Sequence, residues 1–303
     1  MAPSQPDILF DIKNAYYIGN FQHCINEAQK LKAGSAEEQQ ERDMYMYRAY
    51  IAQKKYRVVL DEVDRRHASP DMLAIRMLAD YLASGSDINK KDQVVNQLGE
   101  LLASVDLPSP ILLLMAGYIY NLQQDLAQAL RILQNADSLE CYALQVQIYL
   151  SMNRPDLAKN QLKHMQEKDE DATITQLAQA WVTLCHAVEK RQESFYIYQE
   201  LSDKYSPTPI LLNGQVYALG CQGKYEDADT LAQEALDKDS NNPETLINLI
   251  MLSQKVGKQP EVGSRYLTQL RDSHQAHPYL VNYMEKEQEF DRLTMQFAPA
   301  ASI

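Results

Sequence analysis

A spacing of 34 residues recurs through the last third of this 303-residue chain and constrains its fold more than any other feature. Within each period the apolar residues follow steps of three and four, as in LINLIMLSQ from Leu246, which is the spacing of one face of a helix. A helical repeat of this length predicts helix pairs stacked side by side. The pairs of like residues separated by 34 positions are Leu212 and Leu246, Val216 and Ile250, Gly223 and Gly257, and Leu236 and Leu270.

Two segments carry the residue pattern of a tetratricopeptide repeat. The segment GKYEDADTLAQEALDKDSNNP begins at Gly223 with a turn glycine, an aromatic residue two positions later, and then alanines at fixed sites. In GYIYNLQQDLAQALRILQNA, Gly117 takes the small site of the first helix, and Ala129 and Ala136 take the small sites of the second. Small side chains at these sites allow two antiparallel helices to approach closely.

The small residue that begins the packing face of each second helix can be followed along the whole chain. Its positions are separated by 29 to 36 residues, which predicts eight helix pairs, and a closing helix is expected near Tyr279–Thr294. We therefore expect an all-α, tetratricopeptide-like solenoid that forms a single domain over residues 1–303, with frayed ends at about 1–7 and 299–303. The eight positions are Cys24, Val59, Val95, Ala129, Ala158, Ser194, Ala228 and Val262.

Helix boundaries and the missing strand signals agree with this fold. Ser109-Pro110 and Asn242-Pro243 each place a capping residue before a proline, which is typical of a helix start. Pro155 and Pro207 fall in predicted turns, and the chain lacks alternating apolar segments joined by Asn-Gly or Asp-Gly turns.

The charge of the chain excludes several classes of partner. With 29 basic and 41 acidic residues, the formal net charge is −12, which is unfavourable for binding nucleic acid or an anionic lipid surface directly. No signal peptide or lipidation motif is visible, and the longest apolar stretch, Ile111–Tyr120, is about half of the ~20 residues that a membrane-spanning helix needs. We expect a soluble cytosolic protein that meets membranes only indirectly.

The sequence gives little support to catalysis or to a cofactor. Nucleotide-binding, metalloprotease and nucleophile-elbow motifs are absent, and the four cysteines lack metal-site spacing. Asp169–Asp171 is better explained as a solvated loop than as a metal site, and His274 and His277 have no further ligand nearby. Cys185 and His186 are adjacent on a helix and therefore point in different directions. We expect no enzyme activity, cofactor or metal.

The concave side of the predicted solenoid is the candidate binding surface. The first helix of each pair would line it, and tyrosine, arginine and methionine there are typical of protein-binding surfaces. A solvated face that binds nothing is the plainer interpretation, and the protein-binding groove is favoured over it. The expected groove residues are Arg48, Tyr118, Asn121, Gln147, Thr183, His186, Tyr217, Met251 and Gln254.

Two other functions remain to be considered. A tetratricopeptide co-chaperone that captures acidic carboxyl-terminal tails would need a cluster of basic residues in the groove, and the expected groove offers Arg48 alone. An enzyme with an active site dispersed along the sequence has no motif in its favour.

Several longer stretches, spread over the full length, are more specific than a repeat pattern. Among them are NAYYIGNFQHCINEAQ from Asn14, ERDMYMYRAYIAQKKYRVVLDEV from Glu41, DEDATITQLAQAWV from Asp169, SPTPILLNGQ from Ser206, and QEALDKDSNNPETLINLIMLSQ from Gln233. These stretches resemble the coatomer epsilon subunit family. The resemblance implies a non-catalytic subunit of the coat protein complex I vesicle coat, wrapped as a superhelix around the C-terminal domain of the alpha coatomer subunit and assembled with the remaining subunits. It further implies Golgi-to-ER retrograde and intra-Golgi transport, at the cytosolic face of Golgi membranes and on coated vesicles.

Overall fold

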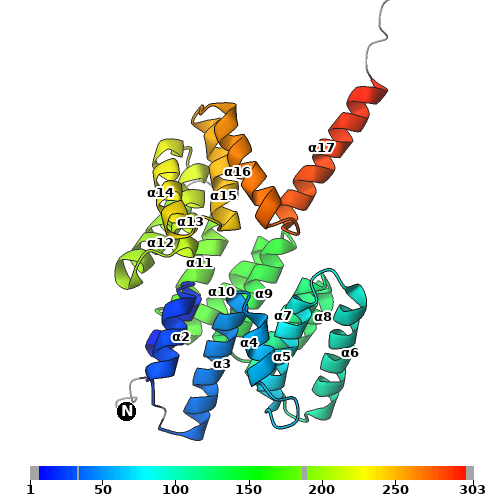
Figure 1. Cartoon of the computed structure of the whole chain (residues 1–303). Coiled ribbons are helices and arrows are strands. Elements are labelled where there is room, and N and C mark those ends of the chain that lie inside the picture. Colours follow the sequence, from blue (N-terminus) through cyan, green and yellow to red (C-terminus); the bar gives the residue numbers. More distant parts are fainter. Residues whose placement is uncertain (1–6, 33, 186–189, 298–303) are drawn as a thin grey trace, which may run out of the picture. The chain divides into compact units, whose positions relative to one another are not determined.

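The computed structural model describes residues 7–32, 34–185 and 190–297, and its regular structure there consists of helices without any strand (Figure 1). The helices form two compact units, residues 1–206 and 207–303, which are described separately below. In unit 1 they are α1 (Phe10–Tyr17), α2 (Phe21–Lys30), α3 (Ala36–Ala52), α4 (Tyr56–Glu62), α5 (Pro70–Ala83), α6 (Ile88–Ser104), α7 (Pro110–Leu122), α8 (Leu126–Leu133), α9 (Leu139–Ser151), α10 (Pro155–Lys168), α11 (Thr173–Leu184) and α12 (Arg191–Tyr205). In unit 2 they are α13 (Pro209–Cys221), α14 (Tyr225–Lys238), α15 (Pro243–Lys255), α16 (Pro260–Ser273) and α17 (Pro278–Gln296).

The predicted all-α fold of eight helix pairs and a closing helix is confirmed over the described residues. Each of the eight small-residue positions falls on an even-numbered helix, the second of its pair. For two of these helices, the predicted position differs by one residue from the one that packs most closely. In α6 the buried residue is Val94 and not Val95, and in α16 a Cβ on Gly263 would lie 2.8 Å from Ser253 Oγ, whereas Val262 is only half-buried.

Close approach of paired helices explains the small residues. A Cβ on Gly117 of α7 would lie 2.7 Å from the side chain of Leu133 on α8, closer than real Cβ contacts permit. Leu133 is itself fully buried. Glycine at 117 therefore lets these two helices pack at the distance that the predicted small site requires.

The helix starts follow the predicted capping chemistry. The hydroxyl of Ser109 accepts a hydrogen bond from the backbone N–H of Leu112, and Pro110 is the first residue of α7. Asn242 caps α15 in the same way, ahead of Pro243. Pro155, expected in a turn, is instead the first residue of α10, where its missing N–H costs nothing because the first turn of a helix leaves that group unbonded.

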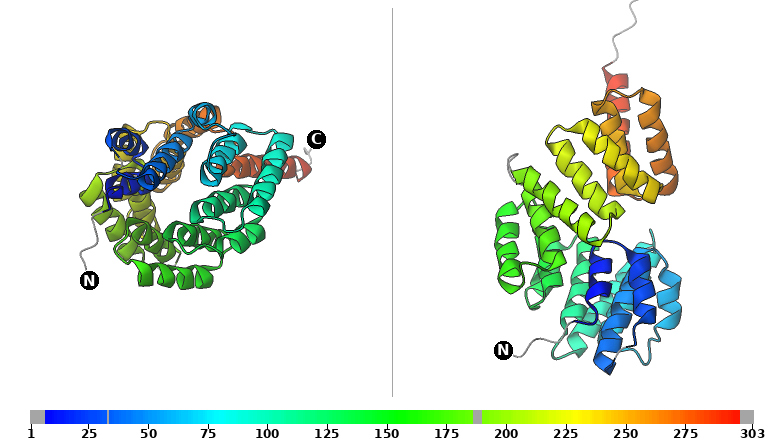
Figure 2. Two further views of the ribbon diagram at one scale, coloured as in Figure 1. Left: turned by 90° about the horizontal axis from the view of Figure 1, so that it is seen from below. Right: turned by 90° about the vertical axis from the view of Figure 1, so that its left-hand side faces the viewer.

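Unit 1 curves until its first and later helices meet. Successive helix pairs from α3 to α9 share one apolar core that includes Ile75, Leu112 and Ile148. After this arc α1 lies beside α11, although about 150 residues separate them in the sequence. Figure 2 (left) shows these helices, from blue through green, following one another along a closed arc. The odd-numbered helices supply most of the residues that line a cavity in this unit.

Unit 2 continues the same repeat. Helices α13 to α16 form two antiparallel pairs, and α14 also packs on α15. The alanines at 228, 232 and 235 of α14 are fully buried, as the repeat pattern predicts. The closing helix α17 anchors to its unit through Leu280, which is buried, while most of its other side chains are exposed.

Candidate protein-binding hollow

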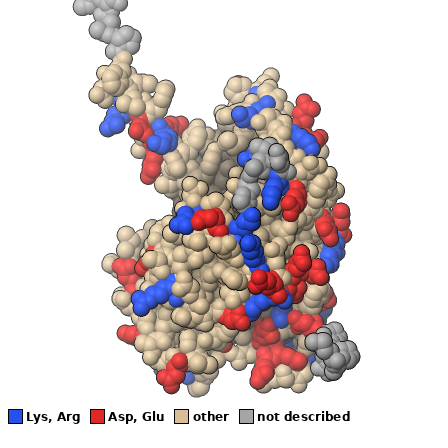
Figure 3. All heavy atoms as spheres, turned by 180° about the vertical axis from the view of Figure 1, so that it is seen from behind, with Lys and Arg blue, Asp and Glu red and all other residues tan. Residues whose placement is uncertain are grey.

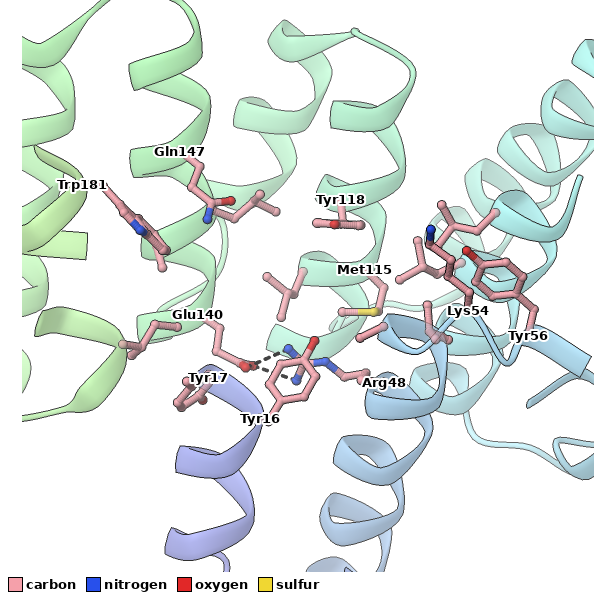
Figure 4. Close-up of a pocket in the computed structure, with 18 residues that line it drawn as sticks. Tyr16, Tyr17, Arg48, Lys54, Tyr56, Met115, Tyr118, Glu140, Gln147 and Trp181 are labelled. Atoms are coloured by element: carbon pink, nitrogen blue, oxygen red, sulfur yellow. Dashed lines mark hydrogen bonds and ion pairs between the residues drawn. The ribbon is translucent and has the colours of Figure 1, made fainter. Parts of the chain in front are cut away.

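The hollow of unit 1 contains a cavity of about 380 Å³, called here the aromatic cavity. It is lined by side chains from α1, α3, α5, α7, α9 and α11, together with the α3–α4 turn and the start of α4 (Figure 4). Aliphatic residues such as Leu78, Leu114 and Leu144 form part of its wall. Its aromatic residues are Tyr16, Tyr17, Tyr56, Tyr118 and Trp181.

A bidentate ion pair crosses the hollow. Arg48 of α3 donates to Glu140 of α9, with Nη1–Oε2 and Nη2–Oε1 distances of 3.1 and 2.8 Å. The guanidinium also lies 4.6 Å from the ring centre of Tyr16 and 5.0 Å from that of Tyr45. Burial opposes the charged form of Arg48, but Glu140 and the two rings outweigh it, so the pKa of Arg48 is raised well above its ordinary value. The pair is therefore charged and removed from water, with side chains only 6% and 11% exposed.

A second cavity of about 600 Å³, the polar cavity, lies at the amino-terminal ends of the inner helices. Helices α7, α9 and α11 begin there, and the acidic residues Asp7, Glu41 and Asp169 contribute to its wall. Tyr17, Glu140 and Ile174 line both cavities. The Arg48–Glu140 pair thus lies where the aromatic and polar cavities meet.

The structure brings three of the predicted groove residues together in unit 1. Arg48, Tyr118 and Gln147 all line the aromatic cavity. Tyr118 is 39% exposed, and burial of part of its ring raises its pKa. Gln147 is exposed and points into the space between α7, α9 and α11 in Figure 4. Arg48 differs from the expectation of an available surface cation, because both of its terminal nitrogens are engaged by Glu140.

The other predicted residues lie elsewhere. Thr183 is buried, and its hydroxyl donates to the carbonyls of Gln179 and Ala180, so its polar atom is satisfied within α11. Asn121 is half-buried and does not line the aromatic cavity. His186 lies outside the described residues. The remaining three, Tyr217, Met251 and Gln254, are exposed on the first helices of unit 2.

Sequence reasoning missed the partner of Arg48 and several aromatic residues of the cavity. Glu140 lies in the first turn of α9, where an acidic residue is ordinarily explained by the helix dipole. Tyr16 and Tyr17 are the last two residues of the short helix α1, and none of the predicted groove residues lies on this helix. Trp181 lies on α11 two residues before the assigned Thr183, and as the single tryptophan it was a signal available in the sequence.

Three of the residues considered for metal binding have local structural roles. Asp169 Oδ1 accepts hydrogen bonds from the backbone of Asp171 and Ala172, which shapes the turn before α11. His274 Nε2 lies 2.7 Å from the carbonyl oxygen of Asn241, and His277 caps α17. Across the described residues, no three His, Cys, Asp or Glu side chains are grouped as a metal site would need.

Two surface properties bear on partners. None of the helices in the described part of the chain is both long and apolar enough to span a membrane. On the face shown in Figure 3, basic side chains occur in short runs among carboxylates and form no broad patch over the residues described there. The aromatic cavity likewise has few cations, since its lining includes only Arg48 and Lys54 among basic residues, and this does not favour capture of an acidic tail.

The family model and the most similar curated proteins agree on one family. The family model described as "Coatomer epsilon subunit" matches residues 5–298. Coatomer subunit epsilon-1 of Arabidopsis thaliana is 39% identical over 294 residues, covering 97% of this chain and 98% of the relative. Coatomer subunit epsilon of Caenorhabditis elegans is 37% identical over 288 residues, covering 95% and 97%.

Solved structures are similar in fold. A tetratricopeptide repeat protein from Parabacteroides merdae aligns with a TM-score of 0.60 at 10% identity, covering 92% of this chain and 96% of that one. The Cut9–Hcn1 structure gives a TM-score of 0.61 at 10% identity, covering 92% and 55%. At this identity the likeness concerns the tetratricopeptide fold alone.

Proposed function

Because the chain belongs to the coatomer epsilon subunit family, we propose that it is a non-catalytic structural subunit of the coat protein complex I vesicle coat and that it binds and stabilises the C-terminal domain of the alpha coatomer subunit. The observation that carries this proposal is a family match extending over residues 5–298. Within the coat it assembles with the remaining coatomer subunits. Its membrane association is then indirect, at the cytosolic face of the Golgi and on coated vesicles, in Golgi-to-ER retrograde and intra-Golgi transport.

The aromatic cavity supports the binding of a polypeptide segment. Tyrosine and tryptophan provide large contact areas at low conformational cost, and they dominate the energetics of many protein interfaces. Tyr118 and Gln147 are exposed members of the wall, so they are available to a segment that enters the hollow. The glutamine amide can donate to and accept from the backbone of an extended segment.

In the proposed function, the protein and its partner stabilise each other by binding. A partner that binds only the folded chain stabilises it by RT ln(1 + [L]/Kd), about 2.7 kcal/mol when the free partner is at a hundred times Kd. The same linkage stabilises the partner. Each protein would therefore protect the other from unfolding and degradation in the assembled coat.

Alanine substitutions of two groove tyrosines test the binding surface. We expect Tyr118→Ala and Tyr217→Ala each to weaken binding of the C-terminal domain of the alpha subunit by about tenfold or more, because a buried tyrosine at an interface commonly contributes above 1 kcal/mol. Isothermal titration calorimetry measures the affinity, and circular dichroism verifies that helix content is retained. Tyr196→Ala, which removes an exposed tyrosine from the second helix of a pair, is the matched control. Unchanged affinity in both groove variants would contradict the concave site.

A further inference from the structure

The ring formed by unit 1 closes through a narrow contact, called here the seam. Its members are Asn14 and Tyr17 of α1 and Arg48 of α3 on one side, and Glu140 of α9 and Thr173 of α11 on the other. Thr173 Oγ1 donates to Asn14 Oδ1 at 2.7 Å across 159 residues of sequence. The Arg48–Glu140 pair bridges 92 residues. These contacts join helices that no shared loop holds together.

The seam differs in chemistry from the contacts between neighbouring helix pairs. From α3 to α9 the pairs share a continuous apolar core, whereas α1 to α3 bury a separate cluster of their own. Across the seam, Tyr17 packs against the apolar cluster of α9 to α11, while Asn14–Thr173 and Arg48–Glu140 are polar contacts. Contacts with little buried apolar surface open at a lower free energy than the core of a domain does.

The buried ion pair also suits a contact that opens and closes. When it is closed, desolvation offsets much of the attraction between the two charges. When the seam parts, water hydrates both Arg48 and Glu140, so the open form is not penalised as an exposed apolar face would be. Asn14 Nδ2 is buried without a hydrogen-bond partner, which adds a further polar group that gains from hydration on opening.

The ion pair lies between the two cavities of unit 1. Arg48 and Glu140 lie where the aromatic and polar cavities meet, and both side chains are nearly inaccessible. Figure 4 shows the paired groups reaching across from α3 to α9. The ion pair therefore forms part of the boundary between the two cavities.

We propose that the seam is a latch, and that α1 to α3 part from α9 and α11 to admit a partner segment into the hollow and then close on it. This inference rests on the proposed function for the identity of the partner, but the opening itself is a property of the isolated chain. A partner held in this way would dissociate only as often as the latch reopens. Association would be limited by opening when the partner concentration is high.

A disulfide across the seam tests the latch in the isolated chain. Asn14→Cys combined with Thr173→Cys places a thiol on each side, at positions whose side chains are in contact. We expect oxidation to slow amide hydrogen exchange at least tenfold in α1 and also in the first turn of α9, while exchange in α7 is unchanged. Fraying of α1 alone would not alter exchange in α9. Equal protection of α1, the α9 start and α7 before oxidation, with no change after it, would overturn the proposal.

Partner binding tests the role of the latch in loading. Oxidation before mixing should slow association with the C-terminal domain of the alpha subunit at least tenfold, and oxidation after complex formation should slow dissociation by a similar factor. The same double-cysteine variant kept reduced is the matched control, because it carries the same substitutions without the covalent link. Equal association rates for oxidised and reduced seam variants would overturn the loading role. If the unmodified chain fails to bind this domain, the proposed function fails, while hydrogen exchange still decides whether the seam opens.

Discussion

At the scale of single residues, one backbone conformation recurs at the end of the first helix in seven pairs. The second residue after each of these helices has a positive φ, between 55° and 81°. Gly19, Gly85, Gly223 and Gly257 occupy four of these sites, while Lys54, Gln124 and Asn153 occupy the others. The corresponding position after α11 lies outside the described residues. The turn is therefore set by the repeat and does not depend on glycine at every site.

Two glycines three residues apart should respond to alanine with opposite signs. At Gly223, φ is +79° and a Cβ would contact nothing, so Gly223→Ala should cost about 1 kcal/mol of unfolding free energy through backbone strain alone. At Gly220, inside α13 and equally open, Gly220→Ala should add up to about 1 kcal/mol through helix propensity. Urea denaturation followed by circular dichroism measures both. A loss of stability at both positions would show that local packing, and not backbone conformation, decides the outcome.

Tyr17 of the seam and its hydrogen-bond partner Tyr45 make stability depend on alkaline pH. Burial, reinforced by the charge of Glu140, raises the pKa of both Tyr17 and Tyr45 above the value of about 10 expected in the unfolded chain. Their stabilising contribution is thus complete below about pH 10 and is lost as the pH rises above it, at up to about 1.4 kcal/mol per pH unit for each group. Tyr45→Phe should therefore reduce the slope of unfolding free energy against pH between about 10 and 11.

Denaturant titrations at a series of pH values provide that slope. Tyr196→Phe, at an exposed position, serves as the control and should leave it unchanged. If Tyr45→Phe kept the same slope of unfolding free energy against pH as the unmodified chain, the Tyr45 hydroxyl would have to ionise as readily in the folded chain as in the unfolded one.

The position of a residue within its repeat predicted some of the side chains that line the aromatic cavity. Tyr118 and Gln147 could be assigned from their position after the core site of a first helix, because that register is local to one repeat. The pairing of Arg48 with Glu140 could not, since it depends on how much curvature accumulates over the five intervening helices α4 to α8. The burial of Thr183 reflects its position near the end of α11, where its hydroxyl bonds back to the helix.

At the scale of helices, periodicity predicted the elements well. Apolar spacing, small residues at helix crossings and proline at helix starts are local signals, and they predicted eight pairs and the closing helix. The register at Val94 and Gly263 was missed by one residue, because adjacent small or apolar residues offer the same pattern in sequence and only packing chooses between them.

The ion pair between α3 and α9 should show strong coupling. Glu140→Gln leaves the buried charge of Arg48 uncompensated. Because that charge is hydrated when the seam opens, the loss of unfolding free energy should stay below the ~3–5 kcal/mol typical of a charge that remains buried. Replacing both residues by methionine removes both charges and should cost much less, giving a large coupling energy in a double-mutant cycle measured by urea denaturation.

The surface pair of Glu27 and Lys30 provides a control for that cycle. Their side chains are 33% and 71% exposed, so Glu27→Gln should change stability far less than Glu140→Gln does. Equal effects of the two glutamine substitutions would contradict the assignment of Arg48 and Glu140 as a buried, structurally coupled pair.

At the scale of the whole molecule, the chain is a tetratricopeptide solenoid of the coatomer epsilon subunit family. The first 206 residues form a unit that closes on itself around an aromatic cavity. A curved stack of helix pairs buries its apolar faces between neighbours, so its inner surface remains available for another polypeptide. The proposed function requires that the alpha coatomer subunit occupies this inner surface.

Site-specific photo-crosslinking can locate the bound partner on the solenoid. Benzoylphenylalanine in place of Tyr118 would put the reactive group on the wall of the aromatic cavity, and the same residue in place of Tyr196 would put it on a second helix. The complex is reconstituted with the C-terminal domain of the alpha subunit and then irradiated. We expect a covalent adduct from position 118 and none from position 196. An adduct from position 196 with none from position 118 would contradict binding in the hollow.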